Sequence, residues 1–333
     1  MKFVKLSIIV PAYNVENYIK KTLNSIINQT FKDFELIVIN DGSTDDTQKI
    51  IEETLLNSDI NYNLINTPNG GVSNARNKGL EVSNGDYIFF LDGDDFIMED
   101  CIEKLYTALI NHNCDVAYTN YVKISEDGEE LSIIPPINLP ETSSPEYLIQ
   151  LEATMAITFS FCQIMYKKSI LADNNLLFNP EMEYGEDTEF ALKVLAHVNQ
   201  IAYVPEKLIF YVQRKNSASR NILFNRYNFV DALDRIIEYY MFNNLSEDII
   251  KLIKTYRIPK SIWGNTVYLF DKDIPTQKVI DELKKRKLIH RLNSFQSIGK
   301  KDVLFVSKIK LFTFSPILYY YLRRFFKLAK EAL

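Results

Sequence analysis

The first 121 residues alternate between strand-like and helix-like segments, and this alternation constrains the fold more than any other feature of the sequence. Runs rich in β-branched and aromatic residues lie at 6–10, 35–40, 63–66, 87–91 and 115–121. Helical patterns fall between them, at about 15–29, 44–57, 73–83 and 99–112. Such alternation predicts an α/β fold, with a mostly parallel sheet between layers of helices.

Beyond about residue 224 the pattern becomes helical only. The clearest pieces are "NRYNFVDALDRIIEYYMF" and "SEDIIKLIKTY". A chain of 333 residues, 47% of them hydrophobic, is long enough for a large first domain and an appendage. We therefore predict a catalytic domain over residues 1–224 and a helical C-terminal region over 225–333.

Four predicted strands are followed by polar or glycine-containing loops. They read "PAYN" (11–14), "DGSTDD" (41–46), "NGGVSNARN" (69–77) and "DGDD" (92–95). Ligands of open parallel sheets bind at the carboxyl ends of the strands, so these loops should hold the chemistry. No GxGxxG follows the first strand and no GxxxxGK[ST] occurs, which argues against a dinucleotide oxidoreductase and a P-loop phosphotransferase.

The loop "DGDD" places Asp92, Asp94 and Asp95 within four positions, directly after the apolar run "YIFFL". Like charges that close together repel and raise one another's pKa unless a cation lies among them. Mn²⁺ or Mg²⁺ on Asp94, with Asp92 or Asp95 nearby, could bridge a diphosphate, because hard cations prefer oxygen ligands. The alternative is a turn with helix-capping acids, which explains one or two of these carboxylates but not three.

Five segments together resemble the family 2 glycosyltransferases with the GT-A fold. "SIIVPAYN", "VINDGSTDDT", "GGVSNARNKGL", "GDYIFFLDGDD" and "YGEDTEFALKV" occur in the order and at about the spacing of that family, over roughly residues 5–220. The resemblance implies an inverting transferase that takes a sugar from a nucleotide-diphosphate sugar, usually a UDP-sugar, with Mn²⁺ or Mg²⁺ as cofactor.

The resemblance also implies roles for individual residues. Asp41 would accept a hydrogen bond from the uracil NH, Arg76 would lie near the base or the phosphates, and Asp94 would bind the metal. Asp92 would meet the ribose or the metal. The other implied donor-binding residues are Pro11, Ala12, Tyr13, Glu16, Asn69, Gly70, Ser73 and Asp95. For Asp41 the alternative is a turn or capping acid, for Arg76 a solvated helix residue, and for Tyr13 a packing aromatic.

The segment "YGEDTEF" supplies a second group of carboxylates. Inverting transfer needs a base to take the proton of the acceptor hydroxyl, and such a base contributes typically about 10²–10⁴-fold. Asp187 is the candidate base, placed at a helix start where the dipole favours an ionised carboxylate, and Glu186 would orient the acceptor or the base. The alternative is that both residues only complete the helix N-terminus.

The segment "QRKNSAS" (213–219) combines two cations with small polar residues after the strand-like "LIFYV". It could close over the diphosphate, with Arg214 giving bidentate contacts and Ser217 a hydroxyl. An ordinary exposed loop is the alternative. The family often has a histidine hereabouts, and this chain has none there, so a histidine metal ligand is not expected.

The C-terminal segment is basic. Thirteen of the 38 Lys and Arg residues lie from Lys284 onward, together with only two of the 43 acids. The aromatic stretch "KLFTFSPILYYYLRRFFKLAK" could lie on an anionic membrane surface, or it could pack on the acidic body of the chain. Its longest uncharged run is too short to span a bilayer.

Three separated cysteines without a CxxC pair indicate reduced thiols, and the N-terminus reads as a first strand without a signal peptide. We expect a cytoplasmic protein, peripheral at the inner face of the cell membrane, without a nucleic-acid partner. The donor sugar (galactose, glucose or N-acetylglucosamine) stays open. The acceptor is expected to be a cell-surface glycan, such as a capsule or exopolysaccharide, or a lipid-linked intermediate.

Two other classes stay open. A sugar nucleotidyltransferase also uses a similar sheet and a metal, but its glycine-rich loop after the first strand is replaced here by "PAYN". A non-catalytic scaffold subunit on a transferase fold would be expected to lack a metal or base carboxylate, and both groups are present.

Overall fold

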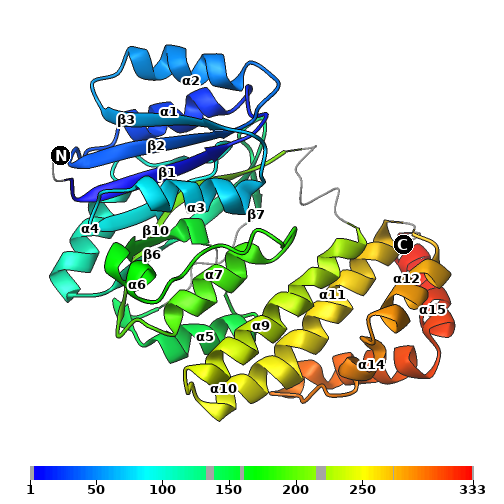
Figure 1. Cartoon of the computed structure of the whole chain (residues 1–333). Coiled ribbons are helices and arrows are strands. Elements are labelled where there is room, and N and C mark those ends of the chain that lie inside the picture. The colour runs from blue at the N-terminus through cyan, green and yellow to red at the C-terminus, as the bar shows by residue number, and fades with distance from the viewer. Residues whose placement is uncertain (1–3, 133–138, 158–160, 215–222, 273, 332–333) are drawn as a thin grey trace. The chain divides into compact units, whose positions relative to one another are not determined.

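The structure is a computed structural model that describes residues 4–132, 139–157, 161–214, 223–272 and 274–331 (Figure 1). It divides into two compact units. Unit 1 contains residues 1–149 and 157–217, and unit 2 contains residues 150–156 and 218–333. The short segment 150–156 belongs to unit 2 although it lies within the predicted first domain. The assignment of 1–224 as a catalytic domain and of 225–333 as a separate region stays a prediction.

Unit 1 is built on one sheet, which has ten strands among the described residues. They are β1 (Leu6–Ala12), β2 (Phe34–Asp41), β3 (Asn61–Thr67), β4 (Tyr87–Phe90), β5 (Phe96–Ile97), β6 (Val116–Ser125), β7 (Glu130–Ser132), β8 (Thr142–Ser143), β9 (Ile164–Lys167) and β10 (Ile201–Gln213). The main path runs β3-β2-β1-β4-β9-β6-β10-β5. Strands β1 to β4 pair in parallel, as do β6 and β10. The predicted mostly parallel α/β sheet is confirmed.

Strand β9 was not predicted, and it runs antiparallel to both of its neighbours, β4 and β6. It therefore separates two parallel groups that the sequence pattern suggested were continuous. A four-residue strand, "IMYK", is too short for a clear periodicity signal.

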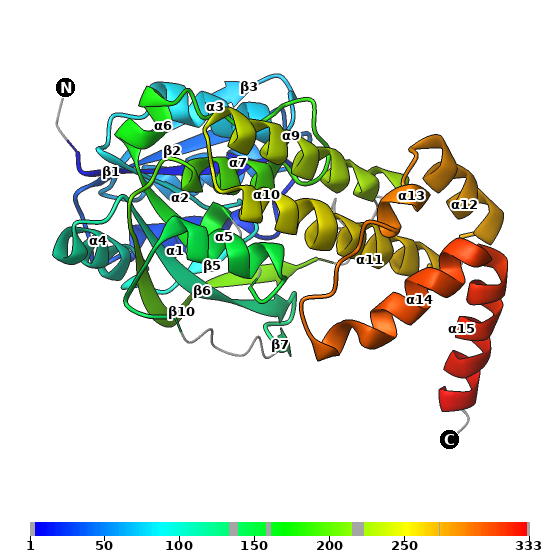
Figure 2. The same cartoon turned by 90° about the horizontal axis from the view of Figure 1, so that it is seen from below.

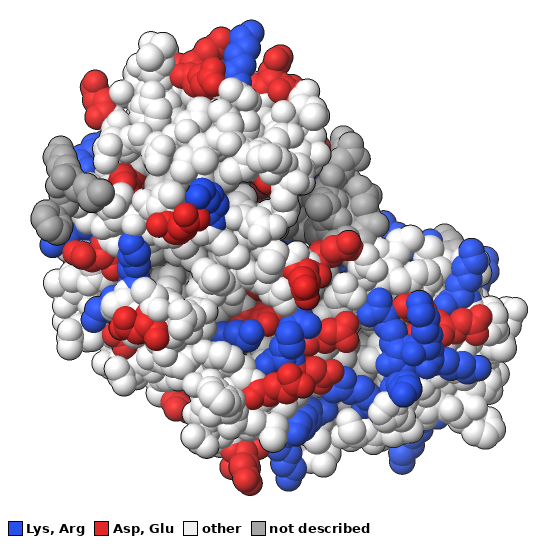
Figure 3. Space-filling view, viewed as in Figure 1, with Lys and Arg blue, Asp and Glu red and all other residues white. Residues whose placement is uncertain are grey.

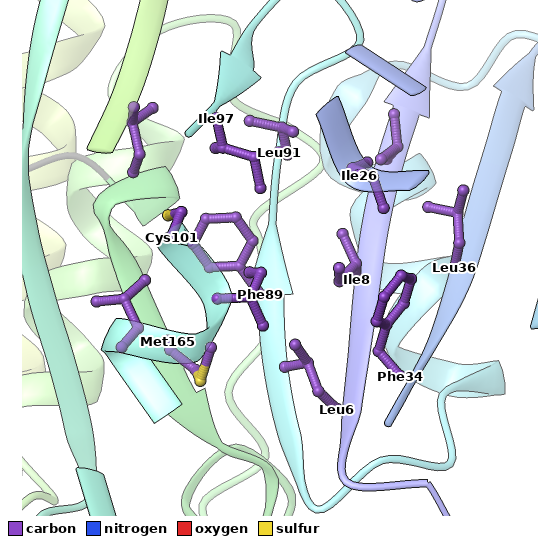
Figure 4. Packing of buried hydrophobic residues seen from close by; sticks show 14 of the residues in the cluster. Leu6, Ile8, Ile26, Phe34, Leu36, Phe89, Leu91, Ile97, Cys101 and Met165 are labelled. Atoms are coloured by element: carbon purple, nitrogen blue, oxygen red, sulfur yellow. The ribbon is translucent and has the colours of Figure 1, made fainter. Parts of the chain in front are cut away.

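Helices cover both faces of this sheet (Figure 1). They are α1 (Ile19–Ile27), α2 (Thr47–Leu56), α3 (Val72–Val82), α4 (Cys101–His112), α5 (Pro145–Ala153), α6 (Lys168–Asp173) and α7 (Glu186–Leu195). Alternate residues of β1 point to opposite faces, so Ile8 packs with α1 and α4 while Ile9 meets α3. Figure 4 shows part of the core on the face of the sheet that α1 and α4 cover. Side chains of β1, β2 and β4 pack there together with Ile26 of α1 and Cys101 of α4.

Gly79 of α3 lies against β1 so closely that a Cβ there would stand 2.3 Å from Ile9 Cγ2. Ile9 is fully buried and has no room to move. We expect Gly79→Ala to lower the free energy of unfolding by about 1–3 kcal/mol through overpacking, measured by urea denaturation. Gly264→Ala in α11 is the control, because nothing lies within 4 Å of a Cβ there and the change should stabilise by about 0.5–1 kcal/mol. Equal effects of the two substitutions would contradict the close contact.

Unit 2 is helical, as predicted for the C-terminal region (Figure 2). Its described helices are α9 (Asn228–Phe242), α10 (Glu247–Leu252), α11 (Ile258–Asp271), α12 (Thr276–Lys285), α13 (Ile289–Leu292), α14 (Val303–Phe314) and α15 (Pro316–Glu331), with a π-helical turn at Ile253–Arg257 and short 3₁₀ turns at Phe224–Tyr227 and Lys300–Asp302. The ring of Trp263 packs against Phe312 and Tyr319, with centroids 5.6 and 5.0 Å away. Within the described chain, no helix combines the length and apolar character needed to cross a membrane.

Candidate active site

The loops after β1, β2, β3 and β4 meet at one edge of the sheet, as predicted. The amide of Gly93 donates to Pro11 O at 3.2 Å, which joins the fourth loop to the first. The amide of Thr44 donates to Asn14 Oδ1 at 2.8 Å, which joins the second loop to the first. A Cβ on Gly42 would stand 2.6 Å from the backbone nitrogen of Asn69, so the second and third loops are also in contact.

Asp41 lies at the end of β2, buried, and its carboxylate holds the glycine loop before α3. Its two oxygens accept from the amides of Gly70 and Gly71, each at 2.8 Å. Gly71 has a φ of +88°, a conformation that favours glycine. Both amides precede α3, so the Asp41 carboxylate ties the third loop to the end of β2, and its predicted contact with a uracil NH stays a prediction. Oδ1 also accepts from the Thr67 hydroxyl at 3.4 Å, whereas Oδ2 keeps a lone pair for a further donor.

The four donor-binding residues predicted in and after the first strand differ in exposure. Pro11 and Ala12 are buried in β1, whereas Tyr13 is 47% exposed at the end of the strand. Glu16 is half-buried, and its Oε2 accepts from the amide of Asp46 at 3.0 Å. Tyr13 therefore has a ring available for stacking, while Glu16 ties the first loop to the start of α2.

In the third loop, Asn69 and Gly70 are exposed and Ser73 is buried at the start of α3. The Ser73 hydroxyl has no hydrogen-bond partner among the described residues. A buried polar atom without a partner is costly, so a ligand or a water molecule at this position would be favoured.

Arg76 lies on α3, buried, and joins two parts of the chain that are far apart in sequence. One of its terminal nitrogens, Nη2, donates to Asp92 Oδ1 at 2.9 Å, and the other, Nη1, approaches Glu186 Oε1 at 3.5 Å. Its guanidinium also lies over the rings of Phe161 and Phe178, 3.9 and 5.1 Å from their centroids. Arg76 therefore connects "DGDD" to "YGED", and the solvated-helix alternative is excluded.

Arg214 follows β10 and pairs with the second carboxylate of "DGDD". Its Nε lies 2.6 Å from Asp94 Oδ2, and its guanidinium lies 5.5 Å from the centroid of Tyr18. Burial raises the pKa of Asp94 to about 6, a rise that Arg214 opposes. The cations that the structure shows beside this acidic cluster are thus two arginines. Ser217, predicted to act with Arg214, lies outside the described residues.

Asp95 differs from its two neighbours, because only 1% of its surface is exposed. Its Oδ1 accepts from the amide of Val212 in β10 at 2.9 Å, and burial raises its pKa well above the usual range. The prediction grouped Asp95 with the donor-binding residues. In the structure Asp95 holds the "DGDD" turn against β10, and its carboxylate is closed to solvent.

Glu186 and Asp187 are the first two residues of α7. Gly185 precedes them with a φ of +94°, a left-handed conformation that lets the chain turn into the helix. The amide of Thr188 donates to Asp187 Oδ1 at 2.6 Å. Both carboxylates are half-buried, so they are placed at the rim of the acidic cluster rather than in the core.

Burial changes the protonation of this pair. It raises the pKa of Glu186 to about 7, helped by the neighbouring charge of Asp187 and opposed by Arg76. Burial also raises the pKa of Asp187, although the Thr188 amide favours the ionised form. The helix N-terminus was expected to keep Asp187 ionised, and its effect is present but smaller than that of burial. Proton uptake by Glu186 near neutral pH therefore becomes accessible.

The carboxylates of this site suit a divalent cation in their chemistry. Asp92 and Asp94 offer oxygen donors, which Mg²⁺ and Mn²⁺ prefer. Within the described ranges, no three His, Cys, Asp or Glu side chains are grouped so that they could hold a metal ion by themselves. A cation here would therefore need further oxygen ligands from a bound substrate or from water.

Sequence reasoning missed three aromatic residues that shape the site. Phe161 and Phe178 hold the guanidinium of Arg76, and Tyr18 lies beside Arg214. The side-chain amide of Asn77 fixes the Phe178 backbone to α3 by two hydrogen bonds, of 2.8 and 2.9 Å. Single aromatic residues in apolar segments give no signal of this kind, because their role depends on a distant arginine.

Comparison with known proteins gives a family. The family described as "Glycosyl transferase family 2" matches residues 7–173, half of the chain. The curated protein "Uncharacterized glycosyltransferase EpsJ" of Bacillus subtilis is 31% identical over 219 residues, which is 64% of this chain and 62% of EpsJ. "Poly(ribitol-phosphate) beta-N-acetylglucosaminyltransferase TarS" of Staphylococcus aureus is 30% identical over 64% of this chain and 36% of TarS. The chain thus spans less than two thirds of the length of these relatives.

Solved structures share the fold. The structure of S. aureus TarS residues 1–349 with UDP-GlcNAc aligns with a TM-score of 0.65 and 25% identity, covering 75% of this chain and 71% of that one. A mannosyltransferase of Pyrobaculum calidifontis, solved with GDP-Man and Mn²⁺, aligns with a TM-score of 0.57 and 15% identity, over 95% of this chain and 82% of that chain. The second likeness concerns the fold alone.

Proposed function

The chain belongs to the family 2 glycosyltransferases, and we propose that it transfers a sugar from a UDP-sugar to a hydroxyl group of a glycan or lipid-linked acceptor, with inversion at the anomeric carbon. The observation that carries this proposal is the contact of Arg76 with both Asp92 and Glu186. It brings a loop suited to the donor and a helix start suited to proton transfer into one site.

The donor half is built from the four strand-end loops. Tyr13 offers an exposed ring to the base, and Asp41 keeps acceptor capacity at the end of β2. Arg214 and Arg76 place two positive charges beside the acidic loop, where a diphosphate leaving group gains negative charge as the glycosidic bond breaks. The relative TarS, whose structure contains UDP-GlcNAc, supports uridine as the nucleoside.

The acceptor half is built on α7. Asp187 is the proposed base, which takes the proton of the acceptor hydroxyl as its oxygen attacks the anomeric carbon. Glu186 orients the acceptor or Asp187, since Arg76 lies 3.5 Å from its carboxylate and fixes it. Because burial raises the pKa of Asp187, the base can hold the proton after transfer better than an exposed aspartate can.

We also propose that Asp94, with Asp92 beside it, holds Mn²⁺ or Mg²⁺ together with oxygen atoms of the donor. The ion would neutralise the charge that develops on the diphosphate. Two features of the chain support this. The donor atoms are carboxylate oxygens, and the pKa of Asp94, raised by burial to about 6, indicates a carboxylate that one arginine does not fully neutralise.

The donor sugar is one of galactose, glucose and N-acetylglucosamine, and the acceptor belongs to a cell-surface polysaccharide such as a capsule or exopolysaccharide. We place the reaction in the cytoplasm, at the inner face of the cell membrane. Support for a reducing compartment comes from Cys101, Cys114 and Cys162, which are all buried as free thiols.

The test is a screen of the full chain with UDP-galactose, UDP-glucose and UDP-N-acetylglucosamine in the presence of Mn²⁺. We expect one of them to release UDP at a rate well above the protein-free background, and UDP itself to bind in a calorimetric titration. GDP-mannose serves as the control for nucleoside choice. The proposal fails if no UDP-sugar is bound or turned over.

Two outcomes of the same screen would point to the other classes. UDP binding without release of UDP from any donor, even with a mixture of glycan acceptors, would indicate a scaffold subunit. Formation of pyrophosphate from UTP and a sugar 1-phosphate would indicate a nucleotidyltransferase.

A further inference from the structure

Helices α14 and α15 of unit 2 expose an unusual amount of apolar surface. Of the 23 large hydrophobic residues that the described chain leaves exposed, nine lie in these 24 positions from 303 to 326. They are Val303, Leu304, Phe314, Ile317, Leu318, Tyr321, Leu322, Phe325 and Phe326, and we call them the tail face. Contiguous exposed apolar residues of this kind mark a site of interaction.

The tail face is a defined side of α15, because the opposite side is packed. Tyr319 is 6% exposed and lies against Trp263, while Tyr320 contacts Phe270 at 5.2 Å between centroids. Arg323 forms two bonds with the Asp271 carboxylate, of 2.8 and 2.9 Å. Leu318, Leu322 and Phe325 recur at helical spacing and share one stripe, which these contacts leave facing away from α11.

Helix α14 is anchored in the same way. Phe312 is fully buried against Trp263 and Ile309 is buried beside it, whereas Val303 and Phe314 are exposed. Ser315 is extended and Pro316 begins α15, so the two helices meet at a corner (Figure 2). Each helix thus keeps one buried side within unit 2 and exposes the other.

The charge of this segment has one sign. From Val303 to Lys330 there is no Asp or Glu, and there are six cations, Lys308, Lys310, Arg323, Arg324, Lys327 and Lys330. In Figure 3, Lys and Arg side chains gather on the part of unit 2 that holds α12 and α15. Joining two copies of the chain through this face would bring like charges together, which costs free energy. The complementary partner is a structure with negative charges at its surface and an apolar interior.

We propose that α14 and α15 form a docking surface for an anionic phospholipid bilayer. The helices lie in the interface, with the Phe and Leu side chains of the tail face among the acyl chains and the lysines and arginines at the headgroups. This places the enzyme beside any lipid-linked acceptor. The inference stands on unit 2 alone and does not depend on the reaction proposed for unit 1.

The experiment is co-sedimentation of the full chain with vesicles of phosphatidylcholine alone or with phosphatidylglycerol. We expect binding to the mixed vesicles that weakens in 0.5 M salt, in keeping with roughly a Debye length of 3–5 Å at such ionic strength, and little binding to phosphatidylcholine alone. Phe325→Ser with Phe326→Ser should reduce partitioning at least about tenfold, because two large apolar side chains leave the interface.

The matched control is Met241→Ser with Phe242→Ser on α9. These side chains are 58% and 84% exposed, comparable to 65% and 67% for Phe325 and Phe326, and they lie outside the tail face. Circular dichroism checks that both variants fold, and light scattering reports the oligomeric state. Lipid binding unchanged by the tail-face variant, equal binding to neutral vesicles, or a dimer that only this variant dissociates would each overturn the proposal. The last result would identify a second copy as the partner.

Discussion

Sugar transfer falls by at least about 10²-fold when Asp187 is replaced by Asn, while the affinity for UDP stays close to that of the unchanged protein. The substitution keeps the shape of the side chain and removes its ability to accept a proton, so it should cost the whole contribution of general base catalysis. Asp41, Arg76 and Asp94 are untouched, and the nucleotide therefore still binds. The measurement is a transfer assay beside a calorimetric UDP titration on both proteins.

The comparison with Glu186→Gln sharpens this test. Glu186 contacts Arg76, whereas the carboxylate of Asp187 accepts a hydrogen bond from the amide of Thr188. If Asp187 is the base, Glu186→Gln should be the milder change. Transfer by Asp187→Asn at nearly the original rate would make Asp187 a helix cap only. Loss of UDP binding in the same variant would assign it to the donor site and make Glu186 the better candidate.

The pH dependence of transfer follows from the ionisation of Asp187. A base works only when ionised, and burial raises the pKa of Asp187, so its protonated fraction at a given pH exceeds that of an exposed aspartate. We expect kcat/KM to fall as the pH is lowered, and this fall should begin at a higher pH than the usual pKa of an exposed aspartate would give. In Asp187→Asn the part of this acid limb that belongs to Asp187 should disappear, while the titration of Glu186 and Asp94, whose pKa values burial raises to about 7 and about 6, remains.

Removal of the divalent cation has the second large effect. EDTA should abolish transfer, and Asp94→Asn should lower transfer by at least about 10²-fold and weaken the metal-dependent part of UDP binding. Asp94 is the carboxylate that Arg214 contacts at 2.6 Å, so the substitution also loosens that arginine. Titration of Mn²⁺ with and without UDP, followed by calorimetry, measures the binding directly and separately from turnover.

The control is Asp86→Asn, at the opposite end of β4. Its carboxylate is exposed, and its one ion pair within the described part of the chain is a long one with Lys5, at 3.8 Å. The same chemical change there should therefore leave UDP binding and transfer unaltered. Full transfer in EDTA would remove the cation from the mechanism. It would leave Arg76 and Arg214 as the charges that neutralise the diphosphate.

The local pattern of hydrophobic and polar residues was sufficient to predict the strands and loops that form the candidate site. The strands predicted at 6–10, 35–40 and 87–91 correspond to β1, β2 and β4, and the four loops after them and after β3 do converge. Alternation of strands and helices reflects which residues face a core, and that is a property of neighbouring positions in the sequence. The same reasoning could not reveal β9, because it is short and its place between β4 and β6 depends on pairing across long separations.

The three aspartates of "DGDD" show what the sequence left open. Nothing in the local sequence distinguishes their roles. In the structure Asp92 contacts Arg76 and Asp94 contacts Arg214, whereas Asp95 is buried and accepts a hydrogen bond from the amide of Val212. Their directions are decided by the turn after β4 and by the elements packed around it. The structure shows arginines in contact with the cluster, which the sequence did not reveal, and the predicted Mn²⁺ or Mg²⁺ stays a prediction.

The amino-acid sequence by itself determined the α/β class, the family and the edge of the sheet at which the four polar loops meet, because hydrophobic periodicity and loop composition depend on neighbouring residues. The tertiary structure alone decided which charges meet: Arg76 with Glu186, 110 positions apart, and the two packed sides that leave the tail face of α14 and α15 exposed. Contacts between distant segments depend on the packing of a shared core, and no local pattern encodes which side chain will stand opposite which.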